Sequence, residues 1–378
     1  MRIVAAPNAF KGSLSAHEAA EAISRGVLRG FPDCEVIQVP VADGGDGLLE
    51  IATDALGGEV CDVTVKGPDM QEITSSFGWV RENRVAVIEM ASASGLAILP
   101  EAKRDPTLTT TFGTGELILA ALDKGAQRII VGLGGSATCD GGIGMATSLG
   151  YRFLDEAGNA LPPIGKSLQH IVSIDTSDID QRLAQVVFDG VCDVTNPLTG
   201  ENGASHVYSP QKGASAEQVL ELDEGLSNLA DVIKREMGMD IRDVPGAGAA
   251  GGLGAGLHCF LSARLEKGID LVLDLVELEK KIQGADLVIT GEGQIDFQTR
   301  FDKAPAGVAR LANRYGIPCI AICGSIGEKI HELYETGIIS VFSICSGPLS
   351  LQEAMDNGAE LVEKTAEQVI RTYLARTY

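Results

Sequence analysis

A series of short apolar runs, each followed by a loop rich in glycine or bearing aspartate, constrains this chain most strongly. The runs alternate with amphipathic helical patterns, an order that predicts a parallel sheet with helices on both faces. Ligands of open α/β sheets bind at the carboxyl ends of the strands. We therefore expect one shared site to be formed by five loops, at residues 7–13, 41–47, 134–142, 193–200 and 291–296.

Both ends of the chain show this alternation. Near the N-terminus, an apolar strand at residues 3–6 is followed by a helix that begins with a capping box, in which Ser15 precedes Glu18. The C-terminal third repeats the pattern, with strands expected at 287–290, 317–323 and 338–344. These segments predict an α/β fold.

The middle of the chain has a different pattern of expected helices and strands from its two ends. It contains a long helical pattern that starts with a second capping box, formed by Ser215 and Gln218. One arrangement that this order allows is discontinuous. Residues 1–70 and 285–378 would form a Rossmann-like parallel-sheet domain, and residues 71–284 would form an inserted second α/β domain.

The net charge and the hydropathy pattern exclude several classes of protein. Asp and Glu number 52 against 30 Lys and Arg, and the resulting charge of −22 argues against nucleic acid or an anionic membrane as a partner. No run of 18 apolar residues occurs, and the short apolar run at the N-terminus indicates a strand rather than a signal peptide. The eight cysteines are scattered without a CxxC pair, as in a reducing compartment. We therefore expect a cytoplasmic protein.

Two glycine-rich segments resemble the dinucleotide-binding motif but lack its context. The first, Gly246-x-Gly248-x-x-Gly251, follows a segment that predicts no good strand. The second, at residues 132–137, follows a strand but continues as a loop. Because the motif needs a strand, a tight turn and a helix in succession, we expect neither segment to bind a nicotinamide cofactor. The first remains suited to cradle phosphate, since small residues let the backbone approach oxygen atoms.

Two lysines lie at positions suited to anions. Lys11 follows the first strand, and Lys303 stands at the start of a predicted helix, where a cation opposes the helix dipole unless an anion is near. Each is either a solvated surface lysine or a contact for phosphate or carboxylate. The five histidines are dispersed without metal-ligand spacing, and neither a P-loop nor a GxSxG segment occurs.

Ten segments carry a resemblance that runs almost from end to end. In chain order they are APNAFKGSLSA, VADGGDG, EMASASGL, RDPTLTTTFGTGEL, GGSATCDGG, CDVTNPLTGENGAS, PQKGA, PGAGAAGG, GEGQID and KAP. Their order and spacing resemble the bacterial glycerate kinase family, of the glycerate 2-kinase type. The resemblance implies a two-domain α/β fold with the active site in the cleft between the domains, ATP as donor and Mg²⁺ as metal. It also implies 2-phosphoglycerate as the usual product, with 3-phosphoglycerate as the alternative.

The chain departs from the family's pattern at several positions. Asn8 and Ala9 stand where Asp and Ser are expected, and Gln294 stands where Arg is expected. The missing carboxylate and guanidinium weaken any role for Asn8 and Gln294. The other ionisable positions of the pattern are present, so the assignment to the family stands.

The matching segments supply residues for each part of phosphoryl transfer, which needs positioning, neutralised phosphate oxygens and an acceptor for the hydroxyl proton. The residues expected to carry catalysis, with the first as general base or metal ligand, are Asp193, Lys11 and Asp140. The residues expected to bind substrate are Lys303, Asn196 and Asp43. Those expected to bind the nucleotide are Gly134, Gly135, Ser136, Gly246, Gly248 and Gly251, and those expected to hold the metal are Glu292 and Asp296.

Two other functions are left open by the residues alone. A nucleotide-dependent oxidoreductase would use the glycine-rich segments, and a non-catalytic sensor of sugar acids would use the same fold without turnover. The partners expected are glycerate and ATP, with neither nucleic acid nor a membrane. A homo-oligomer is compatible with the sequence, which does not determine the oligomeric state.

Overall fold

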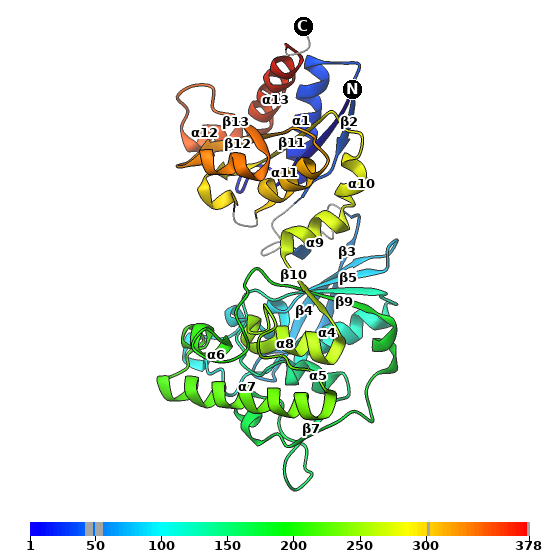
Figure 1. Ribbon diagram of the computed structural model, residues 1–378, viewed down its shortest axis with the longest axis vertical. Helices are drawn as coiled ribbons and strands as arrows, with labels where there is room; N and C mark the ends of the chain where they lie inside the picture. Colours follow the sequence, from blue (N-terminus) through cyan, green and yellow to red (C-terminus); the bar gives the residue numbers. More distant parts are fainter. Residues whose placement is uncertain (42–47, 50–55, 301–302, 376–378) are drawn as a thin grey trace. The chain divides into compact units, whose positions relative to one another are not determined.

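The computed structural model describes residues 1–41, 48–49, 56–300 and 303–375, so Asp43 lies outside the described residues. The chain folds into two compact units, whose elements are drawn in Figure 1. Most of the first unit consists of residues 1–41 together with the chain from residue 268 onward, and most of the second consists of residues 57–267.

The first unit contains a sheet of five parallel strands in the order β13-β12-β11-β1-β2. The strands are β1 (Arg2–Pro7), β2 (Glu35–Gln38), β11 (Leu287–Ile295), β12 (Cys319–Ile326) and β13 (Ile338–Ser343). The helices are α1 (Ala16–Gly30), α9 (Gly268–Leu275), α10 (Leu278–Ile282), α11 (Ala304–Arg314), α12 (Leu351–Asp356) and α13 (Gly358–Leu374). The predicted parallel sheet is therefore confirmed for this part of the chain.

Helices α1 and α13 cover one face of this sheet. Their buried aliphatic residues form a single core with β1, β11 and β12. The predicted capping box starts α1: the Ser15 hydroxyl accepts from the Glu18 backbone N–H, and the Glu18 carboxylate accepts from the Ser15 N–H. Gly26 lets the two helices touch, because an added Cβ there would lie 2.1 Å from the carbonyl oxygen of Glu363. Side chains alternate along strands, so Val4 faces the other side of the sheet.

The second unit contains a mixed sheet of six strands in the order β10-β9-β6-β5-β4-β3, in which β10, β9, β6 and β5 run parallel. The strands are β3 (Glu59–Lys66), β4 (Glu72–Val80), β5 (Val85–Glu89), β6 (Arg128–Gly132), β9 (Val187–Val191) and β10 (Arg264–Glu266), with a separate pair β7 (Arg152–Leu154) and β8 (Ser173–Asp175). The helices are α3 (Ala91–Ser94), α4 (Phe112–Asp123), α5 (Ile143–Ser148), α6 (Ala204–Tyr208), α7 (Ala216–Met237) and α8 (Ala249–Leu261).

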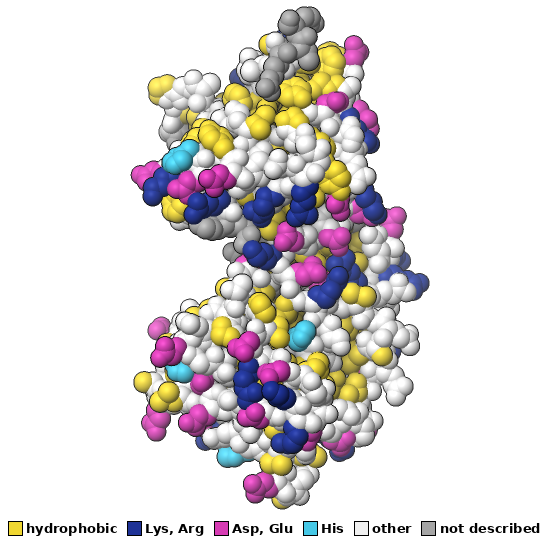
Figure 2. Space-filling view, in the orientation of Figure 1, with side chains coloured by type: hydrophobic (Ala, Val, Ile, Leu, Met, Phe, Trp, Pro, Cys, Tyr) yellow, Lys and Arg dark blue, Asp and Glu magenta, His cyan; other side chains and the backbone are white. Residues whose placement is uncertain are grey.

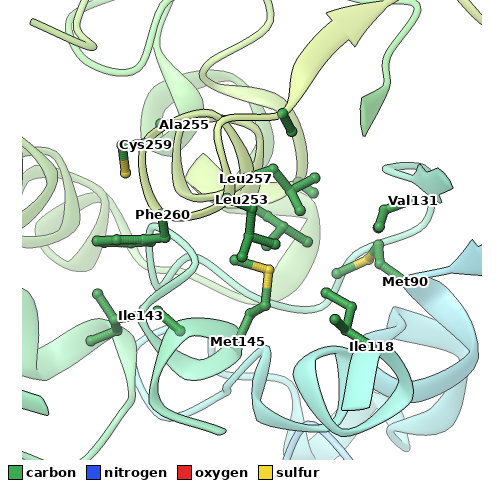
Figure 3. Packing of buried hydrophobic residues seen from close by; sticks show 14 of the residues in the cluster. Met90, Ile118, Val131, Ile143, Met145, Leu253, Ala255, Leu257, Cys259 and Phe260 are labelled. Carbon is green, nitrogen blue, oxygen red and sulfur yellow. The ribbon is translucent and has the colours of Figure 1, made fainter. Parts of the chain in front are cut away.

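The core of the second unit supports the loops at the carboxyl ends of its parallel strands. Figure 3 shows Met145 of α5 pointing toward Leu253 and Leu257 of α8, with Ile118 of α4 and Val131 of β6 beside them. All five side chains are buried. Since α5 and α8 each begin in a glycine-rich loop, this packing fixes where those loops lie.

Two segments belong to a different unit from the one that the sequence predicted. Strand β3 pairs antiparallel with β4, so residues 57–70 lie in the second unit instead of the first. Helices α9 and α10 lie in the first unit, where an added Cβ at Gly307 of α11 would lie 2.4 Å from Ile269 of α9. The apolar pattern of a strand does not specify its partner strand, which is why the boundaries differ.

The surface carries both signs of charge. On the face drawn in Figure 2, Lys and Arg side chains are interspersed with Asp and Glu. Lys234 and Asp240 form one exposed ion pair, with Nζ and Oδ2 2.6 Å apart. Such exposed pairs contribute only about 0–1 kcal/mol each. The buried charges of this protein are therefore more informative than the surface ones.

Candidate active site

The first unit brings two predicted loops together at the carboxyl ends of β1 and β11. The Asn8 N–H donates to the carbonyl oxygen of Gly291 at 2.8 Å. An added Cβ at Gly293 would lie 3.3 Å from the backbone nitrogen of Lys11. Lys11 itself is exposed, and Glu292 is 6% exposed. Two adjacent loops at this edge of the sheet therefore carry an exposed lysine and a nearly buried glutamate.

The predicted metal ligands Glu292 and Asp296 are linked through Thr299. The Thr299 hydroxyl donates to Oε1 of Glu292 at 2.8 Å and accepts from the Asp296 N–H at 3.3 Å. Oδ1 of Asp296 accepts from the Gln298 N–H. Within the described ranges, no group of three or more His, Cys, Asp or Glu is placed to hold a metal ion. The pair fits Mg²⁺ only if substrate phosphates supply further oxygens, which is the usual arrangement for this ion.

Lys303 is the residue that precedes α11, as the sequence predicted. It has extended backbone and a half-buried side chain, and its own side chain makes no capping hydrogen bond. The N–H groups at the start of this 11-residue helix favour anions. Lys303 is thus placed where a carboxylate or phosphate would be stabilised.

In the second unit, the loop after β6 carries Gly134, Gly135 and Ser136 and lies beside α3. The Leu96 N–H donates to the carbonyl oxygen of Gly135 at 2.9 Å, and the Ala137 N–H donates to Ser94 at the same distance. Both glycines are exposed, and the space in front of Gly134 is open, since an added Cβ there meets nothing within 4 Å. Ser136 is nearly buried. The loop is therefore anchored at both sides and accessible at its tip.

The glycines predicted to cradle phosphate at 246–251 are buried against other backbone. An added Cβ would lie 1.9 Å from the Thr138 carbonyl oxygen at Gly251 and 2.3 Å from the Pro197 carbonyl oxygen at Gly248, and Gly246 packs against Cys192. No strand precedes this segment, as expected from its sequence. The close approach for which these glycines are needed is thus made by the protein itself, and their assignment to a nucleotide stays a prediction.

Asp140 is fully buried and holds the start of α5. Its carboxylate accepts four hydrogen bonds, from the N–H and hydroxyl of Thr111 and from the N–H groups of Gly142 and Gly144. Burial raises the pKa of Asp140, and these donors oppose the shift. Because the carboxylate is enclosed and surrounded by donors, the geometry favours a role in holding the loop over direct contact with substrate.

Asp193 lies two residues beyond the end of β9, which confirms its predicted place at the carboxyl end of a strand. Its side chain is exposed. Asn196, three residues further on, is held within the protein: its Oδ1 accepts from the Tyr208 hydroxyl at 2.7 Å and its Nδ2 donates to the Asn202 carbonyl at 2.9 Å. Of the two, Asp193 is the more exposed.

One functional candidate, Lys212, was not singled out from the sequence. It ends the short helix η5 (Pro210–Lys212), is 2% exposed and donates from Nζ to the Ser136 hydroxyl and to the Thr138 carbonyl, both at 2.7 Å. Burial lowers the pKa of Lys212 to about 8. Its only signal in the sequence was its place in the PQKGA segment, since nothing in a polar turn indicates burial of a lysine.

Comparison with known proteins assigns the family. The model of the glycerate kinase family matches residues 3–374. A glycerate kinase of Bacillus subtilis is 49% identical over 378 residues, covering 100% of this chain and 99% of the relative, and a glycerate 2-kinase of Escherichia coli is 46% identical over 372 residues, covering 98% of each. A crystal structure assigned to a glycerate kinase 2 of Salmonella typhimurium LT2 has a TM-score of 0.89 at 45% identity, covering 100% of this chain and 99% of that one.

The helices and the fold of the chain also bear on its class. None of the helices that the structure describes is long and apolar enough to cross a membrane. The fold is mixed α/β with one parallel and one mixed sheet, and it agrees with that of the Salmonella protein along the whole chain. The chain therefore belongs to the glycerate kinase family and is an enzyme of the kinase class.

Proposed function

We propose that this chain transfers the γ-phosphoryl group of ATP to the 2-hydroxyl of D-glycerate, with Mg²⁺ bound to the nucleotide. The observation that carries the proposal is the 46% identity, over nearly the full length of both chains, to the Escherichia coli protein named glycerate 2-kinase. Transfer to the 3-hydroxyl is the alternative product chemistry.

Asp193 is proposed to accept the proton of the attacking hydroxyl. It is an exposed carboxylate at the carboxyl end of a strand, and the neighbouring amide of Asn196 is fixed by two hydrogen bonds and so gives the segment a defined shape. A positioned carboxylate near the reacting hydroxyl is the usual proton acceptor in such transfers. Asn196 and Asp43 are proposed to orient glycerate.

The cationic groups are proposed to neutralise the anionic ends of the two substrates. Lys11 is exposed beside the Glu292 loop, and Lys303 stands at a helix N-terminus. Either can bind a carboxylate or phosphate oxygen. Glu292 and Asp296 are proposed to complete the coordination of Mg²⁺, which, when bound with ATP, screens the charge of the transferred phosphoryl group.

The activity is tested with purified protein, D-glycerate and Mg-ATP in a coupled assay of ADP release. The expected result is ADP release that depends on glycerate. Proton-coupled phosphorus NMR of the product then identifies the hydroxyl, because a phosphate on the 2-carbon couples to a methine and gives a doublet, whereas one on the 3-carbon couples to a methylene and gives a triplet. Absence of glycerate-dependent ADP release contradicts the proposed function.

The role of Asp193 is tested by Asp193→Asn, which keeps the size of the side chain. We expect kcat at saturating substrates to fall by about a hundredfold to ten-thousandfold, the range that general bases supply. Asp155→Asn is the matched control, because Asp155 is a half-buried aspartate of the second unit whose Oδ1 accepts from the turn N–H groups of Ala157 and Asn159. A loss in Asp193→Asn smaller than about tenfold moves the base role to another carboxylate.

A further inference from the structure

Lys212 is a buried lysine whose ammonium group forms no ion pair among the described residues. Its ammonium group donates to two neutral oxygens, the Ser136 hydroxyl and the Thr138 carbonyl, and no acidic side chain forms an ion pair with it in the part of the chain that the structure describes. Asp140 lies near enough to act on it electrostatically, but that carboxylate is occupied by four other donors. An ammonium ion in such a place favours a negative charge nearby.

The bond from Lys212 fixes the direction of the Ser136 hydroxyl. A hydroxyl has one hydrogen to donate and lone pairs that accept, whereas an ammonium group can only donate. Since Ser136 accepts from Lys212, its own hydrogen must point elsewhere, and among the described residues no acceptor receives it. Ser136 is 8% exposed and follows the open tip formed by Gly134 and Gly135. The unused donor is therefore next to the accessible part of the loop.

A second polar atom at this place also lacks a partner. The hydroxyl of Thr138, whose carbonyl accepts the other bond from Lys212, is buried and makes no hydrogen bond within the described structure. Buried polar groups are almost always paired, so an unpaired one indicates a ligand or water. Ser136 and Thr138 each accept a hydrogen bond from Lys212, and each has a hydroxyl hydrogen that no described residue accepts.

We propose that Lys212 is a positioning residue that turns the Ser136 hydroxyl toward an anionic oxygen of a substrate bound at the loop after β6. This inference rests on the proposed function, which supplies two sources of such an oxygen, the carboxylate of glycerate and the phosphates of ATP. Lys212 does not touch the substrate, because it is enclosed. It acts through the hydroxyl that it orients.

The inference is tested by Ser136→Ala, Lys212→Met and the double variant, with KM for glycerate and KM for ATP measured separately. We expect each single variant to raise the same KM by about tenfold, the effect of losing one hydrogen bond to a charged group. The double variant should be no worse than Lys212→Met within about threefold, because both changes remove one interaction. The substrate whose KM rises identifies the anion. Effects that multiply, or unchanged KM values for both substrates, overturn the inference.

The pH dependence gives a readout that a structural role would not change. A neutral lysine amine has a lone pair that accepts from Ser136 and so withdraws the hydrogen from the substrate. We expect the affected KM of the unmodified protein to rise as the pH passes about 8, where burial places the pKa of Lys212, and to stay flat in Ser136→Ala. The other ionisable groups that face Lys212 are Cys139, whose pKa burial raises, and Asp140. A KM that is flat in the unmodified protein overturns the inference even if Lys212→Met does not fold.

Two controls separate this inference from the proposed function. Ser205→Ala removes a buried serine hydroxyl that donates to Val219 on α7, and Lys234→Met removes an exposed lysine charge; both should leave the KM values unchanged. If the unmodified protein turns over glycerate, and the rise in KM of the double variant is the product of the rises in the two single variants, only the inference fails. If it shows no turnover, the proposed function fails, and calorimetry with Mg-ATP and with D-glycerate decides the inference. Tenfold weaker binding of one of these ligands in Ser136→Ala and Lys212→Met alike supports it, and unchanged binding of both overturns it.

Discussion

Asp189 and Lys212 are both fully buried charges in the second unit, and their surroundings are opposite. Asp189 in β9 accepts from Arg128 of β6 at 2.6 Å and from Arg264 of β10 at 2.7 Å, so two cations hold one carboxylate. Lys212 has only neutral oxygens as partners among the described residues. The first group ties three neighbouring strands together. The second lies behind an accessible loop.

The difference shows how the partners of a buried charge indicate whether its role is structural. Removing one member of a compensated group leaves the partners buried without compensation and destabilises the fold. An uncompensated charge already opposes folding, so its removal should stabilise the protein unless it binds something. Deleting Asp189 should therefore lower the free energy of unfolding, and deleting the charge of Lys212 should raise it.

The largest effect on stability is expected from Asp189→Ala. The change removes the buried carboxylate that Arg128 and Arg264 share, and breaking a buried ion pair costs about 3–5 kcal/mol. The free energy of unfolding, from urea titration followed by circular dichroism, should fall by that amount, while kcat and KM of the folded protein should hardly change. Arg264→Met is the milder comparison, because Asp189 then keeps Arg128. A loss below about 1 kcal/mol in Asp189→Ala would mean that the three strands do not depend on this group.

Lys212→Met should act in the opposite direction. The pKa of Lys212 is lowered from 10.5 to about 8 by burial, which corresponds to a cost of at most about 3 kcal/mol for keeping the charge inside. Replacing the ammonium by an apolar group of similar length should therefore raise the free energy of unfolding while weakening substrate binding. Lower stability in Lys212→Met, with binding unchanged, would assign Lys212 to the same structural class as Asp189.

The contrast also separates what the sequence could predict from what it could not. Local signals were sufficient for the capping boxes at Ser15 and Ser215 and for the position of Asp193 after β9. Each depends on a few adjacent residues. The family could likewise be predicted, because its ten segments are local patterns that occur in order.

Contacts between residues far apart in the chain could not be predicted from the sequence alone. The partner of β3 depends on which strand lies next to it, and the burial of Lys212 depends on the loop 74–76 residues earlier. The glycines at 246–251 show the same limit. Their need for close approach was predicted, but the partner is the Thr138 carbonyl of another loop. A sequence pattern indicates that a small residue is required without indicating what comes near.

The smallest expected effect, and the one that separates the two charges most cleanly, is the pH dependence of their stability. A lysine whose pKa is lowered on folding destabilises the folded state fully below its folded pKa, and this penalty is lost as the pH rises toward the unfolded pKa. For Lys212 this window runs from about 8 to 10.5. Within it, the unfolded chain binds more protons than the folded one.

The stability advantage of Lys212→Met over the unmodified protein should therefore be constant up to about pH 8 and then shrink by about 1 kcal/mol per pH unit. Taking the difference between the two proteins cancels the titration of all other groups. The corresponding difference for Asp189→Ala should stay flat across the same window, because its partners are arginines, which do not lose their protons there. Urea titrations of all three proteins between pH 7 and 9.5 measure these differences in the free energy of unfolding. A Lys212 difference that is also flat would mean that folding does not lower the pKa of this lysine, whereas a difference that already shrinks from pH 7 would mean that the lysine is neutral in the folded protein and does not donate to Ser136.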